Sequence, residues 1–294
     1  MKTISAYIHG AKTAWRSLRL TLFIYLSYLG IALLIAIPFF GLFRSATGNS
    51  ELADGLMKGF DATIIREILV SKGQMFRVFI QGLFPWLIGF ALLQVYLTGG
   101  IYSKIASPGG RSNVSGFHKS SIRFFWRFLK LTVYFLIIHI LLGLILYLPY
   151  LIITGVHTNL TDKQVVVPFL ILLTSHLVIL NFIFTWSDLV KSAIYEQDSR
   201  KVFKGIFRCL KMALRNFFRL YLLGILLALA PAAAAAAYYL LRSGVTVDTT
   251  GLIMLFLLIQ QMFIMLRVFF RIWRLSAVYR FYLSAINPIF GHGM

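Results

Sequence analysis

The chain has 294 residues, of which 59% are hydrophobic and 13% are charged, against about 25% charged residues in a typical soluble domain. Its 29 Lys and Arg outweigh nine Asp and Glu and give a net charge of +20. This composition indicates a polytopic helical membrane protein and leaves no room for a separate soluble enzyme domain. The single cysteine, Cys209, excludes an intrachain disulfide.

A basic segment opens the chain, with histidine or cations spaced three or four residues apart: His9, Lys12, Arg16 and Arg19. The first of six runs without a formal charge follows it, and the runs cover residues 20–43, 78–103, 131–156, 165–187, 220–241 and 249–266. A helix rises about 1.5 Å per residue, and the apolar core of a bilayer is about 30 Å thick. Each run therefore predicts one membrane-spanning helix.

Residues 44–77 form the only long connection on the side opposite the basic segments. Apolar residues recur there at every fourth position, interleaved with acids: Leu52, Leu56, Phe60, Ile64 and Ile68. This spacing predicts one or two short amphipathic helices in an outer insertion. A cap over the spans is the simplest role for them, and docking of a partner or entry of a substrate is the alternative.

Two further basic segments precede the third and fifth predicted spans. Their cations recur at spacings of three and four: Lys119, Arg123, Arg127 and Lys130 in one, and Lys201, Lys204, Arg208, Lys211, Arg215 and Arg219 in the other. At about 100° per residue, each set forms one stripe along a helix whose other positions are largely apolar. Such a helix lies in the headgroup plane or packs beneath the spans. The stripes are either ordinary positive anchors or a collective surface for anionic lipid headgroups.

The cations are divided unevenly between the two sides of the predicted bundle. Of the 29 Lys and Arg, 22 lie on the side of the basic segments, whereas six of the nine acids lie on the other side. Because an excess of Lys and Arg in short loops marks the cytoplasmic side, both termini are predicted to be cytoplasmic. Nucleic acid is a poor match for this charge, since the basic residues form no recognisable binding motif.

The basic segment and the span after it recur along the chain. Four pairs of identical residues are each separated by 111 positions: Trp15 and Trp126, Arg16 and Arg127, Leu20 and Leu131, Pro38 and Pro149. A looser third copy ends in Arg219 and Leu220. The pattern predicts three repeat units, about 1–107, 108–198 and 199–294, in a single membrane domain that covers 1–294. Chance similarity between basic–apolar junctions is the alternative.

The predicted fold class is therefore all-α. Six transmembrane helices form three helical hairpins, and a basic amphipathic cytoplasmic helix precedes each hairpin.

Four polar side chains lie at a similar depth within the predicted spans: His139, His176, Gln260 and Gln261. They could form an intramembrane cluster that lines a pathway. Neutral His and Gln side chains also hydrogen-bond between helices without a further role, which is the favoured interpretation.

Asp188 follows directly on the fourth uncharged run. Pairing with Lys191, Arg267 or Arg271 would make it structural, whereas a proton relay would need further buried carboxylates. No HExxH, GxSxG, Walker or CxxC motif is present, and the six histidines lack the spacing of metal ligands. The sequence therefore predicts a protein that is not an enzyme and needs no metal or cofactor.

Three short stretches carry a resemblance to known proteins: Gly99-Gly100-Ile101-Tyr102, Phe124-Phe125-Trp126-Arg127, and Asp188 followed by Glu196-Gln197-Asp198-Ser199-Arg200 and a basic helix. The chain resembles a group of uncharacterised bacterial six-span integral membrane proteins. It is more distantly similar to the membrane domain found ahead of some glycerophosphoryl diester phosphodiesterases, although no phosphodiesterase domain is present. The resemblance implies a protein of the bacterial cytoplasmic membrane with an envelope- or lipid-related role.

The leading prediction is a non-enzymatic integral membrane protein that engages anionic lipid, or a membrane protein partner, through its basic cytoplasmic helices. It would act as a scaffold or accessory subunit. The alternative is a transporter or lipid translocase with a polar cavity at mid-membrane between the repeats.

Overall fold

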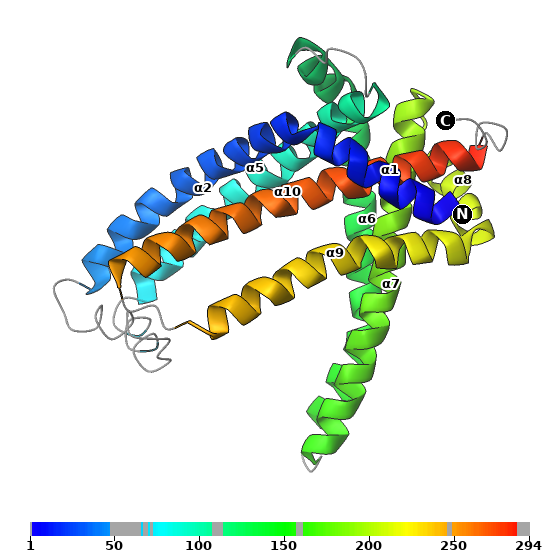
Figure 1. The fold of residues 1–294 in the computed structure, drawn as a ribbon. Coiled ribbons are helices and arrows are strands. Elements are labelled where there is room, and N and C mark those ends of the chain that lie inside the picture. Colours follow the sequence, from blue (N-terminus) through cyan, green and yellow to red (C-terminus); the bar gives the residue numbers. More distant parts are fainter. Residues whose placement is uncertain are drawn as a thin grey trace. The chain divides into compact units, whose positions relative to one another are not determined.

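Every secondary-structure element that the computed structural model describes is a helix, over residues 2–47, 66, 70, 73–107, 114–156, 161–245 and 249–286. The helices are α1 (Lys2–Arg16), α2 (Leu18–Thr47), α5 (Gly73–Ala106), α6 (Val114–Val156), α7 (Asp162–Glu196), α8 (Val202–Arg215), α9 (Phe217–Ser243) and α10 (Thr250–Ile286) (Figure 1). The predicted outer insertion, residues 44–77, lies mostly outside the described residues, so its short helices stay a prediction.

Six of these helices are long and apolar enough to cross a membrane: α2, α5, α6, α7, α9 and α10. Each carries one of the six uncharged runs. A helix satisfies its backbone hydrogen bonds internally, which is the condition for a chain to cross lipid. The predicted all-α class with six potential spans is therefore confirmed.

The chain divides into two compact units. The first holds Met1–Leu18, Val95–Ala237 and Phe269–Met294, and so contains α1, the end of α5, α6, α7, α8, most of α9 and the end of α10. The second holds Arg19–Gln94 and Tyr238–Val268, which include most of α2 and the starts of α5 and α10.

The first unit is packed most tightly at the ends of its apolar runs and just beyond them. The buried residues of α7 all lie between Ile183 and Ile194, although the apolar run of this helix begins near Val165. The end of α10, from Val268 to Tyr282, is buried at most of its positions. Lipid covers apolar side chains as well as protein does, so a span needs little burial, whereas apolar groups outside lipid must pack against one another.

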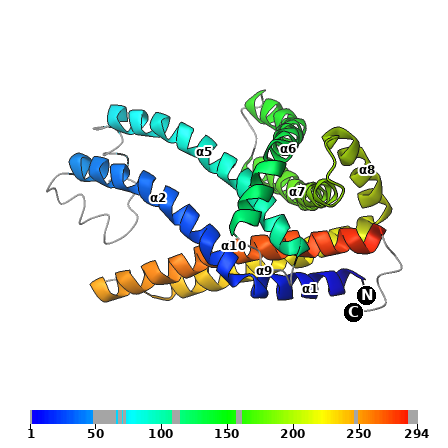
Figure 2. The same cartoon turned by 90° about the horizontal axis from the view of Figure 1, so that it is seen from above.

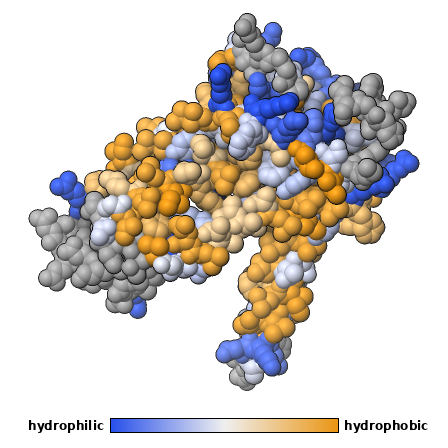
Figure 3. Space-filling view, viewed as in Figure 1, coloured by the Kyte–Doolittle hydropathy of each residue, from blue (hydrophilic) through white to orange (hydrophobic). Residues whose placement is uncertain are grey.

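Helices α6 and α7 form an antiparallel hairpin in which they lie side by side (Figures 1 and 2). Near its tip, the Tyr150 hydroxyl donates a hydrogen bond to the Val165 carbonyl over 3.0 Å. Figure 3 shows apolar side chains along most of the visible face of this hairpin. Hydrophilic side chains gather about its other end, beside α1 and the end of α10. The hairpin thus has the surface of a membrane-spanning element.

Two close helix contacts in the first unit depend on glycine. A Cβ atom at Gly10 of α1 would lie 2.7 Å from the Ala277 Cβ atom of α10, and one at Gly99 of α5 would lie 2.9 Å from the Ser121 Cα atom of α6. The Ser120 hydroxyl also donates to the Gly99 carbonyl over 2.9 Å. At these two crossings the absence of a side chain lets the backbones meet.

In the second unit, two tyrosines of α2 bind glutamines of neighbouring helices. Tyr28 donates to Gln94 Oε1 of α5, and Tyr25 donates to Gln261 Oε1 of α10, each over 2.8 Å. These hydrogen bonds satisfy polar groups that would otherwise face hydrocarbon.

The three basic segments join their spans in two ways. Helix α1 ends before Ser17 and α8 ends before Asn216, so each is a separate helix ahead of its span. The second basic segment is the first part of α6, which continues without a break into its span.

Candidate functional site

The third basic segment forms α8, whose circumference has three faces. The packed face is almost inaccessible: Val202, Ile206, Cys209 and Ala213. The second face is apolar and exposed: Phe203, Phe207 and Leu214, with 57–64% exposure. The third face is cationic and exposed: Lys204, Arg208, Lys211 and Arg215. Exposed phenylalanines beside a cationic stripe are typical of a helix that lies in a membrane interface.

The start of α6 and helix α1 have the same three faces. The packed residues at the start of α6 are Phe117, Ser121, Phe124 and Phe128. The exposed apolar residues there are Ile122 and Trp126. The cations there are Lys119, Arg123, Arg127 and Lys130. The packed residues of α1 are Thr3, Ala6, Gly10 and Thr13. Its exposed apolar residues are Ile4, Ile8 and Trp15, and its cations are Lys12 and Arg16. Sequence reasoning found the cationic stripes but did not separate the two kinds of apolar face.

Two of the predicted headgroup cations, Arg123 and Arg127, bind Asp198 in the loop after α7. The Arg127 Nη1 atom lies 2.6 Å from Asp198 Oδ1, and Arg123 pairs with the other carboxylate oxygen. Hydrogen bonds from Arg127 and Arg123 lower the pKa of the Asp198 carboxyl, which is therefore ionised at neutral pH. The protein itself thus neutralises part of the cationic face of α6.

The backbone at Asp198 ends α7 in a left-handed conformation, with a φ of 48°. Its N–H donates to the Tyr195 carbonyl, and the Ser199 N–H donates to the Ile194 carbonyl. Helices commonly end in this way, but with Gly at the left-handed position. An aspartate here places a carboxylate within reach of the two arginines of α6.

The other predicted headgroup cations have no carboxylate partner among the described residues. Arg208 donates a hydrogen bond from Nη1 to Gln197 Oε1 over 3.0 Å. Within the part of the chain that the structure describes, no ion pair forms at the remaining seven: Lys119, Lys130, Lys201, Lys204, Lys211, Arg215 and Arg219. Their charge is open to partners outside the protein.

A buried ion cluster lies at the end of the α7 span. Asp188 is 0% exposed, with Lys191 Nζ 2.8 Å from Oδ1 and Arg274 Nε 2.8 Å from Oδ2. The Lys191 contact is a hydrogen bond, whereas the Arg274 contact is an ion pair without hydrogen-bond alignment. The predicted Lys191 partner is therefore present, but the second cation is Arg274. Arg271, one of the predicted partners, donates instead to Thr98 Oγ1 over 2.8 Å.

The cluster joins the ends of three helices. Tyr102 of α5 is fully buried, and its hydroxyl donates to the Asp188 carbonyl of α7 over 3.2 Å. Ser192 lies at the same distance from this hydroxyl. Arg274 adds α10 to the network. Each carboxylate oxygen of Asp188 has its own cation, so the arrangement is suited to holding helices together.

The predicted mid-membrane histidines have separate partners. His139 Nδ1 lies 2.5 Å from the Phe135 carbonyl of its own helix, and His176 Nδ1 of α7 lies 3.0 Å from the Tyr147 hydroxyl of α6. The His176 contact joins two helices, as expected of interhelical hydrogen bonding.

The two glutamines of the predicted polar cluster lie in the other unit. Gln261 accepts the hydrogen bond from Tyr25, and Gln260 is exposed. The meeting of all four polar side chains in one cluster stays a prediction.

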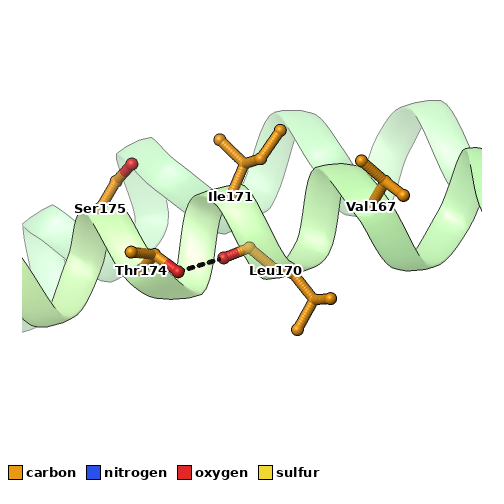
Figure 4. A pocket seen from close by; sticks show the side chains of 5 residues that line it. All are labelled: Val167, Leu170, Ile171, Thr174 and Ser175. Atoms are coloured by element: carbon orange, nitrogen blue, oxygen red, sulfur yellow. Dashed lines mark hydrogen bonds between the residues drawn. The ribbon is translucent and has the colours of Figure 1, made fainter.

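A hollow of about 340 Å³ lies on the membrane-spanning part of α7 (Figure 4). Its lining comes from a single helix: Val167, Leu170, Ile171, Thr174 and Ser175. The Thr174 hydroxyl donates to the Leu170 carbonyl of the same helix over 2.8 Å. The hollow is a mainly apolar surface depression, so it does not supply the polar cavity that transport would need.

Cys209 is not suited to act as a nucleophile. Burial raises the pKa of the Cys209 thiol to about 12, so the thiol is neutral and unreactive at physiological pH. Among the described residues, no three His, Cys, Asp or Glu side chains come close enough together to hold a metal ion.

No family model, curated protein or solved structure matches the chain. The resemblance to bacterial six-span membrane proteins and to the phosphodiesterase-associated membrane domain stays a prediction. Its first motif has a structural role, because Gly99 and Gly100 contact the start of α6 while Ile101 and Tyr102 are fully buried.

Proposed function

We propose that the protein binds the anionic cytoplasmic leaflet of a bacterial inner membrane through α1, the start of α6 and α8. In this role it is a non-enzymatic scaffold or accessory subunit of the envelope, with both termini in the cytoplasm. The observation that carries the proposal is the order of the faces around these three helices.

In each helix, the exposed apolar face follows the packed face by between about a third and nearly half of a turn, at about 100° per residue. The cationic face follows by about another quarter of a turn, in the same sense of rotation. When the packed face rests on the bundle, one rotation therefore directs the apolar face toward lipid and the cations toward headgroups. All three helices meet this condition in the same orientation, since each leads directly into an odd-numbered span.

The shared order also supports the proposed threefold repeat. With the offsets that align Leu20, Leu131 and Leu220, buried positions coincide in all three copies: Ala6, Phe117 and Ile206, and again Thr13, Phe124 and Ala213. Trp15 and Trp126 coincide as exposed residues, at 68% and 67%. A common ancestral unit of a basic helix followed by a hairpin explains these coincidences.

The charge is sufficient for a measurable lipid preference. A Lys or Arg near an anionic leaflet contributes about 1 kcal/mol, and salt screens this attraction over about 10 Å at 0.1 M ionic strength. The side chains of seven of the ten predicted headgroup cations make neither an ion pair nor a hydrogen bond to the described residues, so their attraction to lipid is uncompensated.

Thiol labelling tests the placement of α8 in the interface. Cysteine in place of Lys204 should react with a membrane-impermeant maleimide in reconstituted vesicles, whereas cysteine in place of its neighbour Phe203 should be protected. Both positions are exposed in the protein, so only lipid can cause the difference. The native Cys209 is buried and supplies a silent background. Equal labelling rates for the two variants in vesicles would refute the placement of α8 in the membrane interface. As a control, the two variants should label equally in denaturant.

Lipid retention tests the proposed function directly. Replacement of both Lys119 and Lys130 by Gln should lower several-fold the phosphatidylglycerol that co-purifies with the protein from mixed phosphatidylcholine vesicles. It should also weaken the dependence of that retention on salt. The matched control replaces Lys163 and Arg242 by Gln, with the same change of charge at the opposite ends of the spans, and should retain near wild-type levels. Equal losses in the two variants would argue against the proposal.

A further inference from the structure

The cationic surface of the first unit contains a cleft between α8, the start of α9 and the end of α10. Its volume is about 560 Å³, within the range of roughly 300–1,000 Å³ that is usual for ligand pockets. Four cations line it: Arg208, Lys211, Arg215 and Arg219. The end of α10 lines the cleft with both apolar and polar residues, including Phe281, Ser284 and Ile286.

No described residue compensates the charge of this cleft. No acid is among the residues that line it, and the three acids at the end of α7 have partners elsewhere: Asp188, Glu196 and Asp198. The Glu196 carboxylate, for example, accepts a hydrogen bond from the Tyr279 hydroxyl over 2.5 Å. An anionic ligand would therefore supply the missing negative charge.

One of the four cations is held in place by a buried side chain. The hydroxyl of Tyr282, which is 1% exposed, accepts a hydrogen bond from Gln197 Nε2 over 2.8 Å. The other end of the Gln197 amide accepts the hydrogen bond from Arg208 Nη1. The buried tyrosine thus fixes the amide, and the amide orients the guanidinium at the cleft. This relay distinguishes the cleft from the mobile lysines of an ordinary anchor.

We propose that the cleft is a one-to-one site for a phospholipid whose headgroup ends in a phosphomonoester. The proposal rests on the function proposed above and makes it specific. A phosphomonoester carries a charge close to −2 at neutral pH and three acceptor oxygens, which suit a cleft with three guanidinium groups and an ammonium group. A lipid fits better than free phosphate because the exposed Ala285 and Ile286 offer apolar contact, and Arg219 directly precedes the uncharged run 220–241.

Native mass spectrometry of the full-length protein in mild detergent tests the site. Wild type should bind one phosphatidic acid at least about tenfold more tightly than phosphatidylglycerol and should show no discrete site for phosphatidylcholine. Replacement of both Lys211 and Arg215 by Gln should remove that preference. The matched control replaces Lys201 and Lys204 by Gln, which makes the same charge change beside the cleft, and should keep it. Unfolding temperatures of the variants establish that each is folded.

The possible results distinguish specific lipid binding in the cleft from general attraction to an anionic membrane. Equal loss of phosphatidic acid in both pairs of substitutions would overturn the cleft but leave the proposed function standing. No loss of any anionic lipid in either pair would overturn both. Displacement of the lipid by an equal concentration of glycerol 3-phosphate or inorganic phosphate would also overturn the assignment, because the site would then recognise phosphate without an acyl chain.

A substitution that leaves the charge unchanged tests the relay to Arg208. Gln197→Leu should weaken phosphatidic acid binding several-fold while its salt dependence stays as in wild type, because Arg208 remains present but loses its orientation. Wild-type affinity in this variant would refute the positioning role of Gln197 and, with it, the proposal that the cleft is a preorganised binding site.

Discussion

Asp188→Asn should destabilise the protein by about 3 kcal/mol, the lower end of the range for removing one partner of a buried ion pair. The substitution keeps the size of the side chain but leaves Lys191 and Arg274 at the end of the α7 span without their carboxylate. The lower end applies because these two side chains are 19% and 39% exposed, so water can partly solvate them. Chemical unfolding in detergent micelles, followed by intrinsic tryptophan fluorescence, would measure the loss.

The exposed ion pair at Asp198 supplies the matched control. Asp198→Asn removes the same charge from a carboxylate that also binds two cations, but its side chain is 46% exposed. Such pairs contribute about 0–1 kcal/mol. If the two substitutions cost the same, burial would not be what makes the Asp188 cluster important. Adding Arg274→Met to Asp188→Asn should recover part of the stability, since it removes one of the stranded charges.

Gly99→Ala should destabilise the contact between α5 and α6 by about 1–3 kcal/mol, the usual cost of overpacking. The new Cβ atom would lie 2.9 Å from the Ser121 Cα atom and 3.1 Å from the Ser120 carbonyl oxygen. Because these neighbours are backbone atoms, the helices must separate, which also weakens the hydrogen bond from Ser120 to Gly99. A lower unfolding temperature in detergent is the expected readout.

Gly116→Ala provides the same chemical change without the clash. Nothing lies within 4 Å of a Cβ atom at Gly116, which is near the start of α6. Alanine favours a helix over glycine by up to about 1 kcal/mol, so this variant should be neutral or more stable. A loss of stability in both variants would show that the glycines matter for a reason other than close packing at Gly99.

The sequence was informative where a property depends on local composition. Uncharged runs predicted six spans, and the described part of the chain contains six helices of suitable length and apolarity. The spacing of cations predicted stripes, and the cations of α8 do lie on one exposed face. The Lys191 partner of Asp188 was predictable because residues three apart are neighbours on a helix.

The sequence was less informative about contacts between distant segments. Arg267, Arg271 and Arg274 follow one another at helical spacing, so the pattern could not show that Arg274 reaches Asp188. Likewise, nothing in the spacing of Arg123 and Arg127 showed that they bind Asp198, which is more than 70 residues away. These ion pairs exist because tertiary packing brings separate helices together.

The division of apolar residues into packed and exposed faces also required the structure. Phe124 and Trp126 are both aromatic and lie two residues apart, yet their exposures are 4% and 67%. Apolar side chains that face protein and those that face lipid have almost the same hydropathy, so the sequence does not distinguish them. Only the position of neighbouring helices shows which is which.

The amino-acid sequence by itself determined the all-helical class and the six potential spans, whereas the side on which positive charge collects stays a prediction. These properties follow from local composition and from a helical period of about 3.6 residues. The tertiary structure decided which cations the protein neutralises, which apolar faces stay open, and where four cations converge on one cleft. Such features depend on distances between segments far apart in the chain, and packing alone sets those distances.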